Sequence, residues 1–321
     1  MVTTSASDLA KRIDDAMRAI VVGGEQTTFG LLLALFSRGH ALIEGVPGTG
    51  KTLAVRALAS LIRAEYRRVQ FTPDLLPADL TGTTVFNPQT AQFSIRPGPI
   101  VTNVLLADEV NRTPPKTQSA LLEAMEEARV TIDGTPLVLP QPFFVCATQN
   151  PIEYEGTYPL PEAQLDRFFV KIESTYPQRD QELELLARVA NGFDARAIEP
   201  ATVHAVTEPA EILRVQQEVR RVHVSAPVQY YVLDVVAATR EHRRLALGAS
   251  PRAAVALVTG AQAAAAIDAR DYATPDDVKL VAPLILPHRL IVQPEAEIDG
   301  VRASGVLDEI LHSVRVPREN T

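Results

Sequence analysis

The chain carries the sequence Gly45-Val46-Pro47-Gly48-Thr49-Gly50-Lys51-Thr52, which fits the pattern G-x-x-x-x-G-K-[S/T] at every position. The apolar run 41–45 predicts a buried strand before it, and residues 52–64 predict a helix after it, which is the context that a phosphate-binding loop requires. Glycines let backbone N–H groups curl around phosphate oxygens, and the positive end of the following helix adds to the attraction. A chance glycine-rich turn would not need that strand and helix. The predicted nucleotide-contacting residues are Gly45, Val46, Pro47, Gly48, Thr49, Gly50, Lys51, Thr52 and Leu53.

Two of these side chains have distinct expected roles. Lys51 is placed to reach the β- and γ-phosphates of a nucleotide, and the Thr52 hydroxyl is placed to bind Mg²⁺.

An acidic pair follows the apolar stretch 104–107, at Asp108 and Glu109. Open α/β sheets bind ligands at the carboxyl ends of their strands, so Asp108 is expected to hold Mg²⁺ through water, with Glu109 as the base for an attacking water. Neighbouring side chains of a regular strand point to opposite faces, so we expect the strand to end at Asp108. The alternative is a pair of solvated carboxylates that cap a helix at residues 111–113.

The order of apolar and helical stretches predicts an α/β domain followed by a helical one. Short apolar runs at 67–72, 104–109, 142–150 and 167–173 alternate with helical stretches, which favours a parallel sheet covered by helices on both faces. This alternation stops after Glu173, the polar segment 174–180 follows, and the remaining sequence is mostly helical. We therefore predict an α/β nucleotide-binding domain at 1–178 and a linker with a small all-α domain at 179–321.

Two further segments are expected to form hairpins. Residues 72–100 separate the phosphate loop from the acidic pair and are predicted to be an insertion, a hairpin around a short helix with a turn at Asn87–Pro88. Residues 129–140 contain Asp133–Gly134, a strong signal for a two-residue hairpin turn.

Composition limits the class of protein. The net charge is −8 and the pI is about 5.4, which disfavours a phosphate-neutralising nucleic-acid binder. No apolar run approaches the roughly 18 residues needed to cross a bilayer, and the first residues lack the pattern of a signal peptide. Cys146 is the single cysteine, so no intrachain disulfide can form. We expect no membrane insertion and a cytoplasmic location.

Several stretches together resemble the MoxR family of AAA+ ATPases. They are EGVPGTGKT (44–52), FTPDLLPADLTG (71–82), LLADEVNRTPPKTQSALLEAMEE (105–127), VTIDG (130–134), ATQNP (147–151), LPEAQLDRF (160–168) and SPRA (250–253). The resemblance covers about residues 19–289. It implies an AAA+ core with a parallel sheet sandwiched by helices, followed by a small all-α lid domain.

The resemblance also implies roles for three residues whose local sequence leaves the role open. Asn150 matches the sensor 1 residue that positions the lytic water, although alone it reads as a turn residue before Pro151. Arg167 matches the arginine finger that completes the neighbouring subunit's site, although alone it reads as a surface arginine. Arg252 matches sensor 2, which could touch the γ-phosphate, and alone it reads as a first-turn residue after the helix cap at Ser250.

At the level of the whole protein, the resemblance implies ATP and Mg²⁺ as cofactors, a homo-oligomeric hexameric ring, and chaperone-like remodelling of a client protein with a von Willebrand factor A domain. The hairpins face the pore or top surface in relatives and are candidate client contacts. Relatives carry Gly-Gln-Glu near the end of the first helix, where residues 22–25 here read Val-Gly-Gly-Glu, so no adenine contact is assigned there. The alternatives are a helicase-like or replication-type motor acting on nucleic acid, and a nucleotide-gated scaffold.

Overall fold

The computed structural model describes residues 5–89, 91–150, 156–198 and 203–317, and its centre is a five-stranded sheet. All its strands run parallel, in the order β2-β5-β8-β1-β9. They are β1 (Ala41–Gly45), β2 (Tyr66–Gln70), β5 (Val104–Asp108), β8 (Phe144–Gln149) and β9 (Val170–Ser174). The predicted parallel sheet is therefore confirmed, and β1, which leads into the phosphate loop, lies inside the sheet.

Alternate strand residues face two separate cores, as expected for a sheet covered on both sides. One core contains Ile43 and Leu106 with the buried faces of the N-terminal helices. The other contains Leu42 and Leu105 with α5. The helices of this part are α1 (Ala6–Ile20), α2 (Glu25–Phe36), α3 (Lys51–Leu61), α5 (Pro115–Glu127) and α6 (Glu162–Leu165), with a 3-10 turn at Val110–Arg112.

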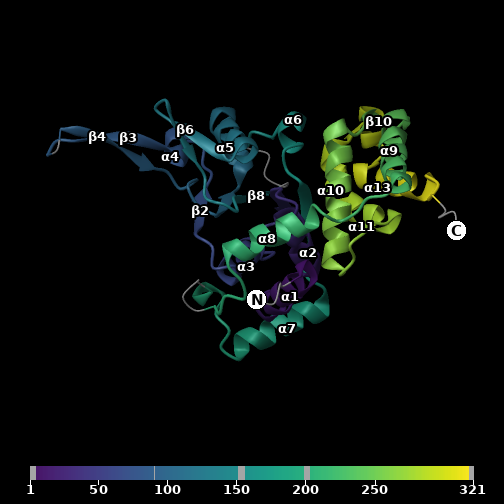
Figure 1. The fold of residues 1–321 in the computed structure, drawn as a ribbon, viewed down its shortest axis with the longest axis horizontal. Coiled ribbons are helices and arrows are strands. Elements are labelled where there is room, and N and C mark those ends of the chain that lie inside the picture. Colours follow the sequence, from purple (N-terminus) through teal and green to yellow (C-terminus); the bar gives the residue numbers. More distant parts are fainter. Residues whose placement is uncertain (1–4, 90, 151–155, 199–202, 318–321) are drawn as a thin grey trace.

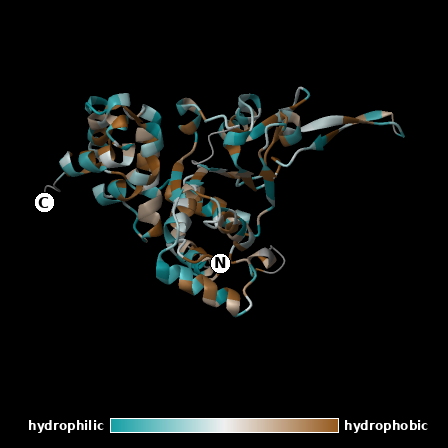
Figure 2. Ribbon diagram, turned by 180° about the vertical axis from the view of Figure 1, so that it is seen from behind, coloured by the Kyte–Doolittle hydropathy of each residue, from teal (hydrophilic) through white to brown (hydrophobic). Residues whose placement is uncertain are grey.

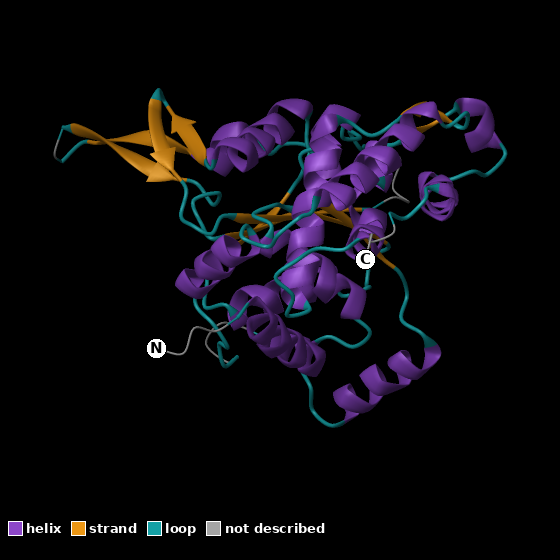
Figure 3. Cartoon of the chain, turned by 45° about the vertical axis from the view of Figure 1, so that its right-hand side comes forward, coloured by secondary structure: helices purple, strands orange, loops and turns teal. Residues whose placement is uncertain are grey.

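The two predicted hairpins are present and stand off one end of the molecule (Figure 1, Figure 3). The short helix α4 (Pro77–Thr81) precedes the hairpin of β3 (Gly82–Asn87) and β4 (Gln92–Pro97) rather than lying within it. The second hairpin pairs β6 (Arg129–Ile132) with β7 (Thr135–Val138). Its turn has Asp133 at φ 47° and Gly134 at φ 84°, the two positive angles of a type I′ turn.

The C-terminal part is helical (Figure 1). Its elements are α7 (Arg179–Ala190), α8 (Pro209–Val219), α9 (Ala226–Glu241), α10 (Pro251–Ile267), α11 (Pro275–Ile285), α12 (Pro294–Ile298) and α13 (Ala303–Ser313), with β10 (Leu245–Leu247), β11 (Ile291–Val292) and 3-10 turns at Ala195–Ala197 and Pro287–Arg289. Of these helices, α8 returns to the α/β part, because Gln216 donates a hydrogen bond of 2.7 Å to the Leu35 carbonyl at the end of α2. The division between residues 178 and 179 stays a prediction.

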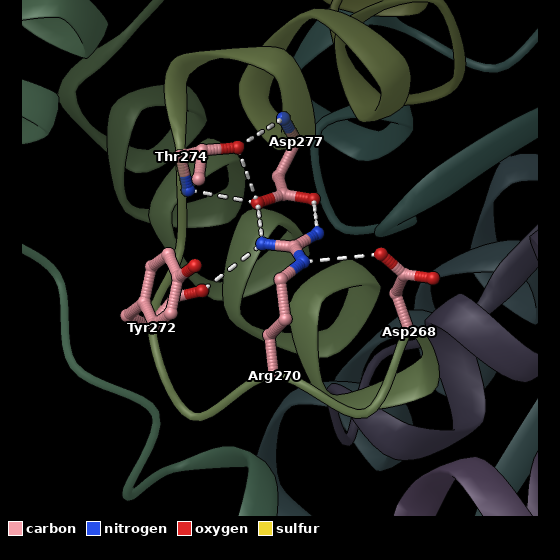
Figure 4. A network of polar contacts seen from close by, with 5 residues as sticks. All are labelled: Asp268, Arg270, Tyr272, Thr274 and Asp277. Carbon is pink, nitrogen blue, oxygen red and sulfur yellow. Dashed lines mark hydrogen bonds and ion pairs between the residues drawn. The ribbon is translucent and has the colours of Figure 1, made fainter.

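A polar network fixes the corner between α10 and α11 (Figure 4). Asp277 is nearly buried and accepts hydrogen bonds from both terminal nitrogens of Arg270, at 2.8 and 2.5 Å. The same carboxylate accepts from the backbone N–H of Thr274 at 2.7 Å, while the Thr274 hydroxyl caps the helix. This is a capping box that doubles as an ion pair, so a single carboxylate holds the helix start and the preceding loop together. Among the described helices, none is long and apolar enough to cross a membrane.

Candidate functional site

The phosphate loop leaves β1 and enters α3 as the sequence predicts. Gly48 and Gly50 adopt φ angles of 86° and 80°, which only glycine takes readily. A Cβ at either position would meet no heavy atom within 4 Å, so the loop borders open space. Loop backbone N–H groups and the first turn of α3 can therefore receive an anion without moving any packed atom.

Lys51 is folded back onto the loop that carries it. Its ammonium group donates to the carbonyls of Gly45 and Val46, at 2.6 and 2.8 Å. Burial lowers the pKa of Lys51, and the negative charges of Asp108 and Glu109 partly oppose that effect. The lysine thus rests on two carbonyl oxygens, which a phosphate would replace as its partners.

The acidic pair is built as predicted, because β5 ends at Asp108. Glu109 takes the left-handed conformation, φ 58° and ψ 51°, which is uncommon for a residue with a side chain. This backbone turn breaks the alternation of the strand, so both carboxylates line the same cavity. Thr148 at the end of β8 secures the geometry: its hydroxyl donates to Asp108 and accepts from the Glu109 N–H at 2.9 Å.

Three side chains that were not predicted from the sequence also hold the carboxylates. Arg68 binds Asp108 with Nη2 at 2.7 Å, and Gln70 donates to Glu109 at 2.7 Å. Both project from the same face of β2, which pairs with β5 in the sheet. Arg112 adds an ion pair to Glu109 at 3.2 Å. In the sequence, the alternation of a strand places residues 68 and 70 on one face. Only the strand order shows that this face lies beside Asp108 and Glu109.

One cavity of about 470 Å³ gathers most of the predicted catalytic residues. Asn150 follows β8 and lines this cavity, where it lies among the buried polar residues. Pro151, which underlay the turn interpretation, is outside the described residues. The lining residues that belong to the sequence predictions are Pro47, Gly48, Thr49, Gly50, Lys51, Thr52, Leu53, Asp108, Glu109 and Asn150.

This donor set fits a magnesium triphosphate. The hydroxyl of Thr52 and the carboxylate of Asp108 are hard oxygen ligands of the kind that Mg²⁺ prefers. The open space beside Gly48 and Gly50 is the cradle for phosphate oxygens.

A second, smaller cavity of about 100 Å³ continues from the phosphate loop and shares Thr49, Gly50 and Lys51 with the first. Residues 21–24 line one side of it and residues 173–178 the other. Gln181 closes it, with its amide so close to Gly23 that a Cβ there would lie 2.7 Å from Oε1.

Arg167 and Arg252 lie away from this cavity, at the edge of the sheet where the parallel strands begin rather than where they end. Arg167 precedes β9, whose first residue Val170 pairs with Ala41 at the start of β1, whereas the phosphate loop follows the end of β1. A strand of five residues separates the two edges by roughly 15 Å. Glu126 binds both arginines, Arg167 at 3.3 Å and Arg252 at 2.5 Å. The structure therefore brings these two predicted residues together with each other, but not with Lys51.

The lid holds the loop that carries Arg167. Arg289, which is 7 % exposed, forms an ion pair of 2.6 Å with Asp166 and donates to the carbonyl of Phe168 at 2.7 Å. His288 makes a further 3.0 Å contact with the same carbonyl. Burial lowers the pKa of Arg289, and Asp166 opposes that shift. A displacement of the lid would therefore pull directly on the residue next to Arg167.

Comparisons with known proteins agree with this geometry. Residues 40–170 match the family described as "ATPase family associated with various cellular activities (AAA)", and residues 237–310 match the AAA lid domain. The site and the fold thus define an AAA+ ATPase-type protein.

The relatives narrow the class further. The chain is 41 % identical to "Chaperone MoxR1" of Mycobacterium tuberculosis, over 95 % of this chain and 81 % of that protein. It is 48 % identical to an uncharacterised protein, YeaC, of Bacillus subtilis, over 96 % of this chain and 95 % of the relative. A crystal structure of a candidate ATPase from Cytophaga hutchinsonii superposes with a TM-score of 0.89 at 42 % identity, covering 98 % of this chain and 96 % of that one. The chain belongs to the MoxR family of AAA+ ATPases.

Proposed function

We propose that this chain binds Mg²⁺ and ATP and hydrolyses ATP between subunits of a homo-oligomeric ring. The observation that carries the proposal is the single cavity in which Lys51, Thr52, Asp108, Glu109 and Asn150 meet. A nucleotide-binding scaffold would need only the first two of these, whereas a general base and a water-orienting amide serve a reaction.

Each side chain has a task that follows from its position. Lys51 leaves the carbonyls of Gly45 and Val46 for the phosphates. Thr52 and Asp108 would hold Mg²⁺, which would supply positive charge beside the phosphate oxygens. Glu109 takes the proton from the attacking water, which Asn150 orients. The base of the nucleotide lies in the small cavity against residues 21–24 and Gln181.

The remaining charge comes from a neighbouring subunit. Arg167 and Arg252 sit at the far edge of the sheet from the phosphate loop, so we infer that both reach the loop of the next copy. An arginine supplied in this way stabilises the transition state and is worth several kcal/mol. In a closed ring of such contacts, every nucleotide site would receive arginines from a neighbouring subunit. The family resemblance implies six subunits.

The output proposed for this motor is chaperone-like remodelling of client proteins. Its support is the relative named a chaperone, together with the net charge of −8. A client with a von Willebrand factor A domain and client contacts by the hairpins are proposals from the resemblance. A cytoplasmic location is a proposal from the sequence pattern of the first residues and the single cysteine. Action on nucleic acid is the less favoured alternative, and DNA-stimulated turnover would reverse that ranking.

The test is steady-state ATPase activity against protein concentration, with Mg²⁺, for the wild-type chain and Glu109→Gln. We expect specific activity that rises with concentration and drops about 10²-fold or more in Glu109→Gln, while ATP stays bound. Wild-type turnover in Glu109→Gln would remove the proposed base. Tight ATP binding without turnover in the wild-type chain, even at high concentration, would favour the nucleotide-gated scaffold.

A further inference from the structure

Helix α7 carries an apolar face that no other described residue of the subunit covers. None of its twelve residues is buried, and the helix stands off the lower edge of the α/β part (Figure 1). Leu183, Leu186 and Val189 are 68 %, 66 % and 56 % exposed and recur every three residues, so they share one side of the helix. Teal and brown segments alternate along its ribbon (Figure 2). A contiguous apolar stripe on an exposed helix marks a contact surface.

The helix is nevertheless fixed in direction by polar anchors. The Arg188 guanidinium donates to the carbonyls of Ala19 and Arg18, at 2.9 and 3.0 Å, which belong to the last turn of α1. It also pairs with Glu184 at 2.5 Å. The first turn is held as well, because Gln181 packs against Gly23. These anchors occupy the polar side of α7, so the leucine side points outwards.

The position of α7 identifies what can cover it. Gln178 and Gln181 line the cavity that continues from the phosphate loop, so the helix begins at the edge of the nucleotide site. That site lacks Arg167 and Arg252, and a copy that supplies Arg252 must bring the first turns of its α10 to the same place. Val255 lies one turn beyond Arg252 on that helix and is 66 % exposed.

The charges of the two surfaces are also complementary. Near its start α7 carries the exposed acidic residues Asp180, Glu182 and Glu184. The cavity that contains Arg167 and Arg252 is also lined by Arg38 and the buried Arg289, and these four arginines outnumber its two carboxylates, Glu126 and Asp166. Opposite charges at the two faces favour one relative orientation of the copies and disfavour contact between two identical faces.

We propose that the apolar face of α7 (Leu183, Leu186 and Val189) is the docking surface for a second copy of this chain, which places Val255 of its α10 against the leucines. This inference rests on the proposed function, because it takes the delivery of Arg252 to the neighbouring site as given. The helix that receives the neighbour also closes the nucleotide cavity through Gln181.

One test compares Leu183→Glu/Leu186→Glu with the wild-type chain by sedimentation velocity, in Mg²⁺ and a slowly hydrolysed ATP analogue. We expect the double variant to need at least tenfold more protein to assemble, while monomers bind a fluorescent nucleotide with unchanged affinity. The matched control is Leu233→Glu on α9 of the lid, where the leucine is 54 % exposed. If the double variant assembles at the same concentration as the wild-type chain, the docking surface on α7 is wrong but the proposed ring still stands. If the wild-type chain never assembles, the proposed ring is wrong as well.

A second test locates the contact. Cys146 is the single cysteine of the chain and is buried, so introduced cysteines report without interference. We mix two single variants, Leu186→Cys and Val255→Cys, with the ATP analogue under mild oxidation. A disulfide-linked dimer that forms in the mixture and in neither variant alone supports the inference. A dimer of Leu186→Cys with itself, or no dimer from an assembled mixture, overturns it.

Discussion

Replacement of Asp277 by alanine tests whether one carboxylate holds the lid corner. The side chain is 5 % exposed and receives the two terminal nitrogens of Arg270 and the backbone N–H of Thr274. Bonds to a charged acceptor are worth about 1.5–3 kcal/mol, and a lost helix cap costs about 1 kcal/mol. Arg270 keeps 24 % of its side chain exposed, so water recovers part of its solvation. We expect Asp277→Ala to destabilise the lid by about 3 kcal/mol.

Thermal unfolding followed by circular dichroism measures this loss. A change of that size lowers the unfolding midpoint by roughly 6–12 °C. Asp268→Ala is the control, because Asp268 binds the same guanidinium at 3.0 Å but is 74 % exposed, and such pairs are worth less than about 1 kcal/mol. Equal midpoints for wild type and Asp277→Ala, or an equal loss in both variants, would refute the reasoning.

The effect also has a defined pH dependence. Burial raises the pKa of Asp277, but the bonds from Arg270 and Thr274 outweigh it, and the net shift is downwards. A depressed carboxyl pKa stabilises the folded state above the unfolded pKa, about 3.9, and that contribution is lost as the pH falls through the folded pKa. The midpoint difference between wild type and Asp277→Ala should therefore be constant above about pH 5 and shrink in more acidic buffer.

The remaining predictions concern the nucleotide site. Lys51→Ala should weaken ATP binding strongly or abolish it, because the phosphates lose their only loop-borne cation, and calorimetric titration measures this. Arg167→Ala should bind ATP normally and lose turnover about 10²-fold or more, and rings mixed with Glu109→Gln chains should show that the defect acts on the neighbour's site; wild-type turnover in assembled rings would exclude Arg167 as the finger. Arg68→Ala should lower the Mg²⁺ concentration for half-maximal turnover about two- to fivefold, since a half-exposed arginine no longer competes for Asp108; an unchanged requirement would count against that competition.

Local motifs made the centre of the site predictable from the sequence. The phosphate loop follows from residue types at fixed spacing, and the end of the strand at Asp108 follows from the need for two adjacent carboxylates to share a cavity. The prediction gave the helix after the loop as residues 52–64, whereas α3 ends at Leu61, because helix ends depend on caps that the pattern did not show.

Contacts between distant segments were not predictable in the same way. Arg68 reaches Asp108 only because β2 pairs with β5, and the order of strands in a parallel sheet is not written in local periodicity. Glu126 was not among the predicted residues, because its two arginine partners come from different domains. The small sheet of β10 and β11 was missed since strands of three and two residues carry no measurable pattern.

The position of the arginines at the opposite edge of the sheet from the phosphate loop has a consequence for how copies can associate. On the proposed assembly each subunit has one donor face and one acceptor face, so contacts are head to tail and a two-fold symmetric pair would complete neither site. An open row of n chains then has n − 1 complete sites, and its end subunit keeps a site without a donor. Only a closed ring gives every nucleotide site a neighbour that supplies the arginines. One chain with a damaged arginine face, placed in such a ring, would therefore inactivate one site and leave the other sites active.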